Sequence, residues 1–173
     1  MSLVTAAIAS AAAGSAEAQP SPPARLQGAF TMTGVVTVAH HVPGEHVGQQ
    51  VTRTWTFAPL CPTVPCTTVQ VLRTRINGSD TVVLNLRPGG FYAGRGIFYL
   101  PLRCAGRRYP HGEQVPFKLT VRVTGKAVVN GTVIATGIVA TYRNRTRKNL
   151  TPCVAVLGHD AASYGGTLQP PPA

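Results

Sequence analysis

Acidic residues are scarce in this 173-residue chain, which has 5 Asp and Glu against 16 Lys and Arg and a formal net charge of +11. Mechanisms that need two facing carboxylates therefore have few candidate residues. Long apolar runs are also missing, because no stretch reaches the roughly 18 residues that a membrane-spanning helix needs. Apolar and β-branched residues are nevertheless common enough to build the core of one compact domain.

Helical periodicity is missing after residue 25. Thr and Val dominate instead, and apolar residues alternate with polar ones, most cleanly over 117–124. That alternation is typical of a half-buried strand. The predicted strands are 30–40, 49–58, 67–75, 81–87, 91–102, 117–124, 134–142, 153–157 and 162–168.

Turn residues separate these runs. Pro43-Gly44, Asn77-Gly78 and Asn130-Gly131 lie between strands, and Asn-Gly is a strong hairpin signal because the turn needs positive φ. We treat Ala105 to Gly112 as a further turn. The pattern predicts an all-β fold, an antiparallel meander of eight or nine strands that closes as a small β-barrel or folds as a two-sheet sandwich.

The N-terminal segment differs from the rest. Residues 1–18 are rich in alanine and end in Ala16-Glu17-Ala18, which resembles the cleavage site of a secretory signal peptide, although no Lys or Arg precedes the apolar stretch. A disordered tail is the alternative. We expect a flexible Pro-rich spacer at 19–26, a single β-domain at 27–168 and a disordered tail at 169–173. The exported chain, secreted or held in the cell envelope, would carry 16 basic and 4 acidic residues, a formal +12.

The four cysteines agree with export, because an even number in an exported chain indicates a disulfide framework. Three pairings are possible. Cys61 and Cys66 flank a Pro-Thr-Val-Pro segment that favours a turn, so we expect a local bridge between them, which leaves Cys104 to pair with Cys153. The competing interpretation is a four-thiolate zinc site, but the usual C-x2-C spacing is missing.

Several features occur in a fixed order: Thr54-Trp55-Thr56-Phe57, then Cys61 and Cys66, then Tyr92-Ala93-Gly94, then a late cysteine before a final Gly/Thr strand. With the leader and the Ala, Gly, Thr, Val and Arg usage, this order resembles small exported β-domains of high-GC Gram-positive bacteria, over roughly residues 27–168. The resemblance implies a location and a fold, since that family has no assigned activity. The meander also resembles the calycin barrels, which bind small ligands, with Gly28-Ala29-Phe30 in place of their Gly-x-Trp.

Catalytic and metal sites have weak candidates. His40, His41 and His46 surround a turn with Glu45 and could hold a transition metal, but adjacent strand residues point to opposite faces, so we interpret them as solvated histidines. The mature acids Glu45, Asp80, Glu113 and Asp160 all fall in predicted turns or loops. No complete catalytic constellation can be assembled, so we predict no enzyme activity, no metal and no cofactor.

The basic residues are more informative, and 13 of the 16 are arginine. One cluster surrounds Cys104 and another precedes Cys153. Their members are Arg103, Arg107, Arg108, Arg143, Arg145, Arg147 and Lys148. If the two cysteines pair, the clusters converge and would attract an anion. A solvated basic surface is the plain alternative. Arg53 shares a strand face with Trp55, and we expect it to lie beyond the core at the strand end.

We therefore favour a secreted, non-enzymatic β-domain that binds an anionic cell-wall polymer, glycan or membrane surface through this basic patch, with no nucleic-acid partner. The alternative is a calycin-like barrel that binds a small ligand in a cavity lined by Trp55, Phe57 and Phe98. A hydrolase that uses His159, Asp160 and Ser163 is less favoured, because no nucleophile elbow surrounds the serine.

Overall fold

Every regular element in the described part of the chain is a β-strand, which confirms the all-β prediction. The computed structural model describes residues 23–62, 64, 66–75, 78–154 and 157–170. The strands are β1 (Gly28–His40), β2 (Gln50–Pro59), β3 (Thr68–Arg75), β4 (Gly78–Arg87), β5 (Phe91–Cys104), β6 (Arg107–Val129), β7 (Thr132–Asn144), β8 (Lys148–Asn149) and β9 (His159–Leu168). The predicted signal peptide at 1–18 and the ends of the spacer and tail, 19–22 and 171–173, lie outside the described residues.

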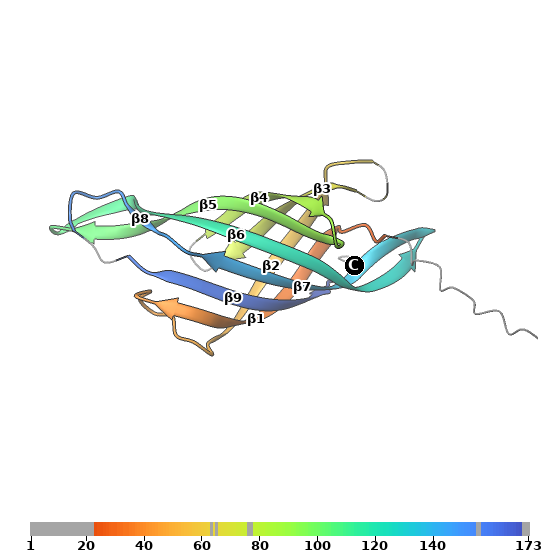
Figure 1. The fold of residues 1–173 in the computed structure, drawn as a ribbon, viewed down its shortest axis with the longest axis horizontal. Helices are drawn as coiled ribbons and strands as arrows, with labels where there is room; N and C mark the ends of the chain where they lie inside the picture. The colour runs from red at the N-terminus through yellow and green to blue at the C-terminus, as the bar shows by residue number, and fades with distance from the viewer. Residues whose placement is uncertain (1–22, 63, 65, 76–77, 155–156, 171–173) are drawn as a thin grey trace, which may run out of the picture.

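Eight of the strands close into an antiparallel barrel (Figure 1). Strands that follow one another from β1 to β7 pair side by side, and β9 pairs with both β7 and β1. The short strand β8 lies outside this ring and pairs with β6. The predicted meander is therefore confirmed, and of the two architectures left open it adopts the barrel. The seam between β4 and β5 is the shortest of the ring, since the two strands pair there only through 85–87 and 91–93.

Two predicted boundaries are wrong. The turn at Ala105 to Gly112 is only two residues long, because β6 begins at Arg107 and pairs at once with β5 through Cys104. No strand occupies the described residues of 153–157. There Cys153 is tied to Cys104, and its carbonyl accepts a hydrogen bond from the Asn149 side chain, so this backbone is held by contacts other than a ladder.

The interior of the barrel is apolar toward one end. There the alternating inward positions carry large buried side chains, and Leu26 of the N-terminal segment packs among them. The fully buried residues of this core include Phe30, Met32, Val69, Val71, Leu84, Leu119, Val121 and Ile138. We call the other end, where β1, β3, β5 and β7 finish and β8 lies, the polar end of the barrel (Figure 1).

Close packing against an aromatic ring explains Gly96 of β5. A Cβ on Gly96 would lie 2.4 Å from the ring of Phe117, so only glycine fits against that ring. The irregularity of β5 falls further along, between Leu100 and Leu102.

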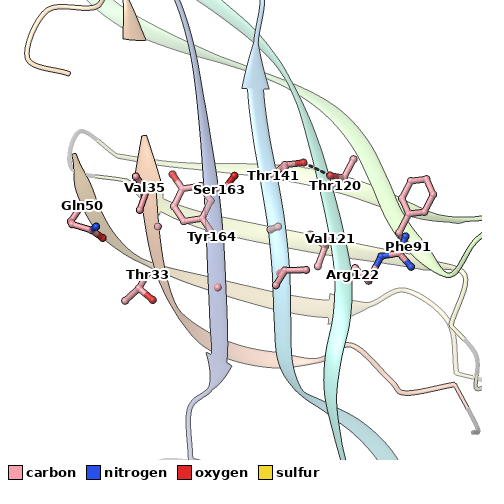
Figure 2. A pocket seen from close by; sticks show the side chains of 14 residues that line it. Thr33, Val35, Gln50, Phe91, Thr120, Val121, Arg122, Thr141, Ser163 and Tyr164 are labelled. Atoms are coloured by element: carbon pink, nitrogen blue, oxygen red, sulfur yellow. Dashed lines mark hydrogen bonds between the residues drawn. The ribbon is translucent and has the colours of Figure 1, made fainter. Parts of the chain in front are cut away.

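The outer face of the barrel is rich in hydroxyls. Thr120, Thr141 and Ser163 come from the adjacent strands β6, β7 and β9, and the hydroxyls of Thr120 and Thr141 are hydrogen-bonded to each other (Figure 2). Such outward polar positions alternate with inward apolar ones, as expected for a barrel with a filled core.

Both expected disulfides are present. Cys61 pairs with Cys66 and Cys104 with Cys153, with Cα–Cα distances of 5.4 and 5.8 Å, and no free cysteine remains. Two disulfides fit a protein of an oxidising compartment. Among the described residues, no helix is long and apolar enough to cross a bilayer.

Candidate functional site

All four carboxylates of the described residues gather at the polar end of the barrel. Asp80, Glu113 and Asp160 lie in β4, β6 and β9, and only Glu45 lies in a turn. The prediction that all four occupy turns or loops is therefore wrong for three of them. Each of the three is an inward position of its strand, and their side chains are nearly buried.

Two arginines of β3 hold the first of these carboxylates. Arg73 and Asp80 face each other directly across β3 and β4, and Nε of Arg73 donates to Oδ1 at 2.8 Å. Nε of Arg75 donates to the other oxygen, Oδ2, at 2.7 Å. The Arg73 guanidinium also lies over the ring of Phe117, and that of Arg75 over Phe98, both 3.9 Å from the ring centre. Asp80 is thus fully engaged, and the arginines rest on aromatic walls.

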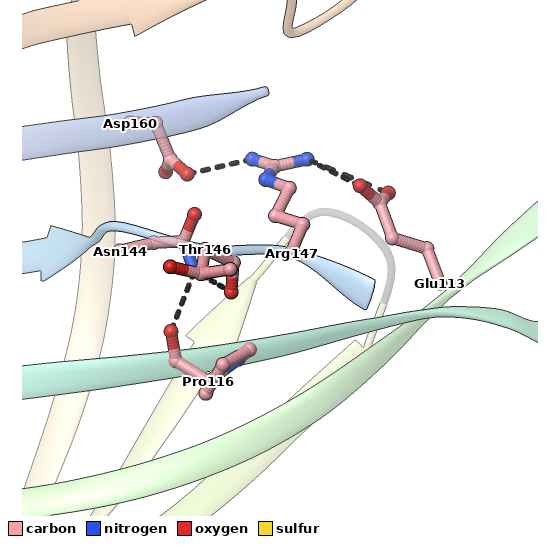
Figure 3. Close-up of polar contacts among 6 residues, drawn as sticks. All are labelled: Glu113, Pro116, Asn144, Thr146, Arg147 and Asp160. Carbon is pink, nitrogen blue, oxygen red and sulfur yellow. Dashed lines mark hydrogen bonds and ion pairs between the residues drawn. The ribbon is translucent and has the colours of Figure 1, made fainter. Parts of the chain in front are cut away.

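A second network joins the other two buried carboxylates through one guanidinium. Nη2 of Arg147 donates to Oδ1 of Asp160 at 2.6 Å, and Nη1 donates to Oε1 of Glu113 at 3.3 Å (Figure 3). Burial opposes the charge of Arg147, but the hydrogen bond to Asp160 and the charges of both carboxylates outweigh it and raise the pKa of Arg147. The guanidinium therefore stays charged inside the barrel.

Arg147 was expected in the exposed basic patch, and the structure corrects this. Arg143 lies on the outer face of β7, but β7 ends at Asn144, so the two-residue alternation does not continue to Arg147. Buried Asn144 donates from Nδ2 to the carbonyl of Pro116 at 2.5 Å and to that of Thr146 at 3.4 Å (Figure 3). These bonds hold the end of β7 against β6, and the segment that follows directs Arg147 inward.

The networks surround a pocket of about 360 Å³ that opens at the polar end. Its walls combine aromatic and aliphatic side chains with charged ones. The side chains that line it include Trp55, Phe98, Leu100, Tyr142 and Tyr164, together with Glu45, Arg53, Arg73, Arg75, Glu113, Arg147 and Asp160. This volume lies within the usual range of small-molecule sites, roughly 300–1,000 Å³. Phe57, the third residue expected to line a cavity, packs in the apolar core instead.

Four polar groups around this pocket, with Nη2 of Arg73 among them, lack a full set of hydrogen-bond partners in the described part of the chain. The buried Nε of Arg147 and the buried hydroxyl of Tyr142 make no hydrogen bond. The Tyr142 hydroxyl lies beside Asp160, which helps to raise the pKa of this phenol. Arg53 makes no ion pair, and its Nη1 donates only to the carbonyl of Thr52, at 2.8 Å. Orphaned buried groups are costly, so the Arg147 Nε and the Tyr142 hydroxyl invite a ligand atom, and the half-buried Arg53 adds a charge beside them.

The protonation of the pocket follows from its burial. Desolvation, with the charge of Asp160 adding to it, raises the pKa of Glu45. The same two effects raise the pKa of Tyr142, and desolvation raises that of Tyr164. The two phenols are therefore neutral hydroxyls that can donate a hydrogen bond at physiological pH.

The predicted basic patch has six exposed members once Arg147 is removed. Arg103, Arg107 and Arg108 lie at the tip of the β5–β6 hairpin, and Arg143, Arg145 and Lys148 lie at and beyond the end of β7. The Cys104–Cys153 bridge and the pairing of β8 with β6 bring both segments to the polar end of the barrel.

The histidines form a different cluster from the expected one. His40 stacks on His159 of β9, with ring centres 4.9 Å apart, and contacts His41 at 4.1 Å. Among the described residues, no group of three or more His, Cys, Asp or Glu side chains has a metal-binding arrangement. In β9, Asp160 points inward and Ser163 outward, so these two cannot share a catalytic site with His159.

We expected Arg53 to lie beyond the core at the strand end, but it lines the pocket at the polar end of the barrel. The strand face that it shares with Val51, Trp55 and Phe57 correctly indicated this inward position.

Searches among protein-family models, curated proteins and solved structures found no match to this chain, so its function is argued from the pocket itself.

Proposed function

We propose that the protein binds a small amphipathic anion in the pocket at the polar end of its barrel. The observation that carries this proposal is the set of unpaired donors, Arg53 and the buried Arg147 Nε and Tyr142 hydroxyl, facing an open cavity inside an otherwise filled barrel. Of the three functions considered from the sequence, this is the small-ligand barrel.

The chemistry of the ligand follows from the walls. Trp55, Phe98 and Leu100 offer apolar contacts, and the three donors sit beside them. Asp80, Glu113 and Asp160 are already bound by arginines. Of the arginines in the described lining of the pocket, Arg53 is the one without an ion pair, and the nearby Glu45 interacts with it only electrostatically. A ligand with a planar apolar body and one carboxylate or sulfonate group satisfies both parts of this surface.

The amphipathic aromatic sulfonate 1-anilinonaphthalene-8-sulfonate is a suitable probe, and calorimetry measures its affinity and stoichiometry. We expect one saturable site per chain. Arg53→Gln should weaken binding about tenfold or more, because a charge-assisted hydrogen bond contributes about 1.5–3 kcal/mol. Arg145→Gln, which removes the same charge from the outer face, serves as the matched control and should change the affinity less than about threefold.

An equal loss of affinity in the two variants would show that binding of the probe depends only on the net charge of the protein. That result would overturn the pocket as the binding site. Several weak sites with no effect of Arg53→Gln would do the same.

The protein is also proposed to act outside the cytoplasm, after removal of residues 1–18. Two disulfides and the alanine-rich leader support this. Expression in a high-GC Gram-positive host, with N-terminal sequencing of the product from the medium, should give a chain that starts at Gln19. An intracellular product that retains Met1 would contradict export.

A further inference from the structure

The outer face of the barrel carries a row of cations that sequence spacing does not reveal. Arg95 of β5 pairs directly with Lys118 of β6, and Lys118 pairs directly with Arg143 of β7. All three are exposed and point outward. We call these three residues the cationic row. Only strand register places Arg95 and Lys118 beside Arg143, since they are far apart along the chain.

No carboxylate balances this row. Every acidic side chain of the described residues lies at the mouth of the barrel, where Asp80, Glu113 and Asp160 bind arginines inside it. None of the three cations forms an ion pair in the described part of the chain. Like charges that face each other across strands are destabilising, so the fold gains nothing from the row. An anionic partner would offset this repulsion.

The row lines a hollow of about 850 Å³, which Arg145 also borders. Next to it lies a second hollow, of about 720 Å³, and Thr120, Thr141 and Ser163 line both (Figure 2). A concave surface that runs across several strands with cations and hydroxyls fits a chain rather than a flat layer. A bilayer surface could not enter it.

The chemistry of the hollow favours a saccharide over a nucleic acid. The aromatic residues in the described lining of this hollow are Phe117 and Tyr142, and both are inward positions of their strands. The adjoining hollow adds Tyr164 and Phe91, which are half-buried, and Phe91 lies against Arg122. A row of exposed rings on which successive bases could stack is therefore missing from the described lining. Hydroxyl and guanidinium groups, in contrast, match the hydroxyl and acidic groups of an anionic sugar chain.

We propose that the cationic row, with the adjoining threonine-lined hollow, is a binding surface for a linear anionic polysaccharide. The surface keeps Arg143 of the basic patch predicted from the sequence, and it places Arg95 and Lys118 of the barrel side where that prediction had the arginines of the hairpin tip. It is independent of the interior pocket.

The test measures binding of a heparin hexasaccharide at several salt concentrations. The row variant is Arg95→Thr/Lys118→Thr/Arg143→Thr, and its matched control, Arg103→Thr/Arg107→Thr/Arg108→Thr, removes the same charge from the hairpin tip. We expect the row variant to lose about tenfold or more in affinity with a shallower salt dependence, and the tip variant to lose less than about threefold. Arg53→Gln should leave this binding unchanged.

A thermal melt serves as the folding control, and the row variant should be at least as stable as the wild type, because repulsion has been removed. If the triple variant does not fold, Lys118→Thr alone should weaken binding about threefold. Equal losses in the row and tip variants would overturn the proposed surface. Tighter binding to a single-stranded DNA oligonucleotide or to anionic phospholipid vesicles would overturn the polysaccharide as the partner.

Discussion

Arg147 donates a hydrogen bond to Asp160 across 2.6 Å inside the barrel, and both side chains are nearly buried. The same guanidinium reaches Glu113 on its other side. Two carboxylates thus depend on one cation for their charge balance. This guanidinium therefore ties β6 and β9 together at the wall of the pocket.

The first prediction follows from this dependence. Arg147→Met leaves Glu113 and Asp160 buried without a cation, so we expect a loss of about 3–5 kcal/mol in the free energy of unfolding. Guanidinium titration measures it. Arg145→Met, two residues earlier and exposed, should stay within about 0.5 kcal/mol of the wild type. A loss below about 1 kcal/mol for Arg147→Met would mean that the two carboxylates find other partners.

The two disulfides should contribute differently to the free energy of unfolding. Cys104 and Cys153 are 49 residues apart and Cys61 and Cys66 only 5. In the chain-entropy model the bridge that closes the long loop stabilises the folded protein by about 4 kcal/mol, and the bridge that closes the short loop by about 2 kcal/mol. Paired Cys→Ser variants, compared by equilibrium unfolding, should preserve this order. The reverse order would show that local strain or denatured-state structure, rather than loop length, determines how much each bridge stabilises the protein.

A glycine pair tests the packing of adjacent strands. A Cβ on Gly94 would lie 2.2 Å from the carbonyl oxygen of Val83, a backbone atom that cannot move away, whereas Gly165 has nothing within 4 Å. Gly94→Ala should therefore lose about 1–3 kcal/mol of stability, and Gly165→Ala should lose none. Thermal unfolding of the two variants checks this, and equal behaviour would contradict the packing described.

The raised pKa of Glu45 gives a pH dependence of known sign. Because burial and Asp160 raise this pKa above its ordinary value of 4.5, the folded protein binds the proton more tightly than the unfolded chain does. The contribution of Glu45 to stability is therefore full below the ordinary value and is lost as the pH rises through the folded pKa.

Glu45→Gln removes this contribution. As the pH rises above the ordinary value of 4.5, the stability of the wild type should fall relative to that of Glu45→Gln. Parallel urea titrations of the two proteins measure the difference, in which the other titrating groups cancel. A flat difference, or one that grows in favour of the wild type, would show that Glu45 is solvated.

Much of the fold could be predicted because its signals are local. Alternation over 117–124 and the turns at Pro43-Gly44 and Asn130-Gly131 indicate strands and hairpins without any knowledge of pairing. The proline-rich segment between Cys61 and Cys66 likewise indicated its own bridge.

The charged pocket could not be predicted, because it depends on where strands end and how the sheet closes. Alternation placed Arg147 with Arg143 and Arg145, but β7 ends at Asn144 and the chain turns inward there. Asp160 meets Arg147 only when β9 closes the ring, whereas Asp80 faces Arg73 across the β3–β4 hairpin. The cationic row has the same origin, since register alone sets Lys118 beside Arg95.

The central claim is that the small anion enters the pocket at the polar end. Trp55 is the only tryptophan of the chain and lines this pocket, so its emission reports on whatever binds there. Titration with 1-anilinonaphthalene-8-sulfonate should quench Trp55 by energy transfer at one equivalent, and Arg53→Gln should shift the midpoint about tenfold to higher concentration. If Trp55 emission is unchanged while the probe binds, or if Arg53→Gln leaves the midpoint where it was, the pocket is not the binding site.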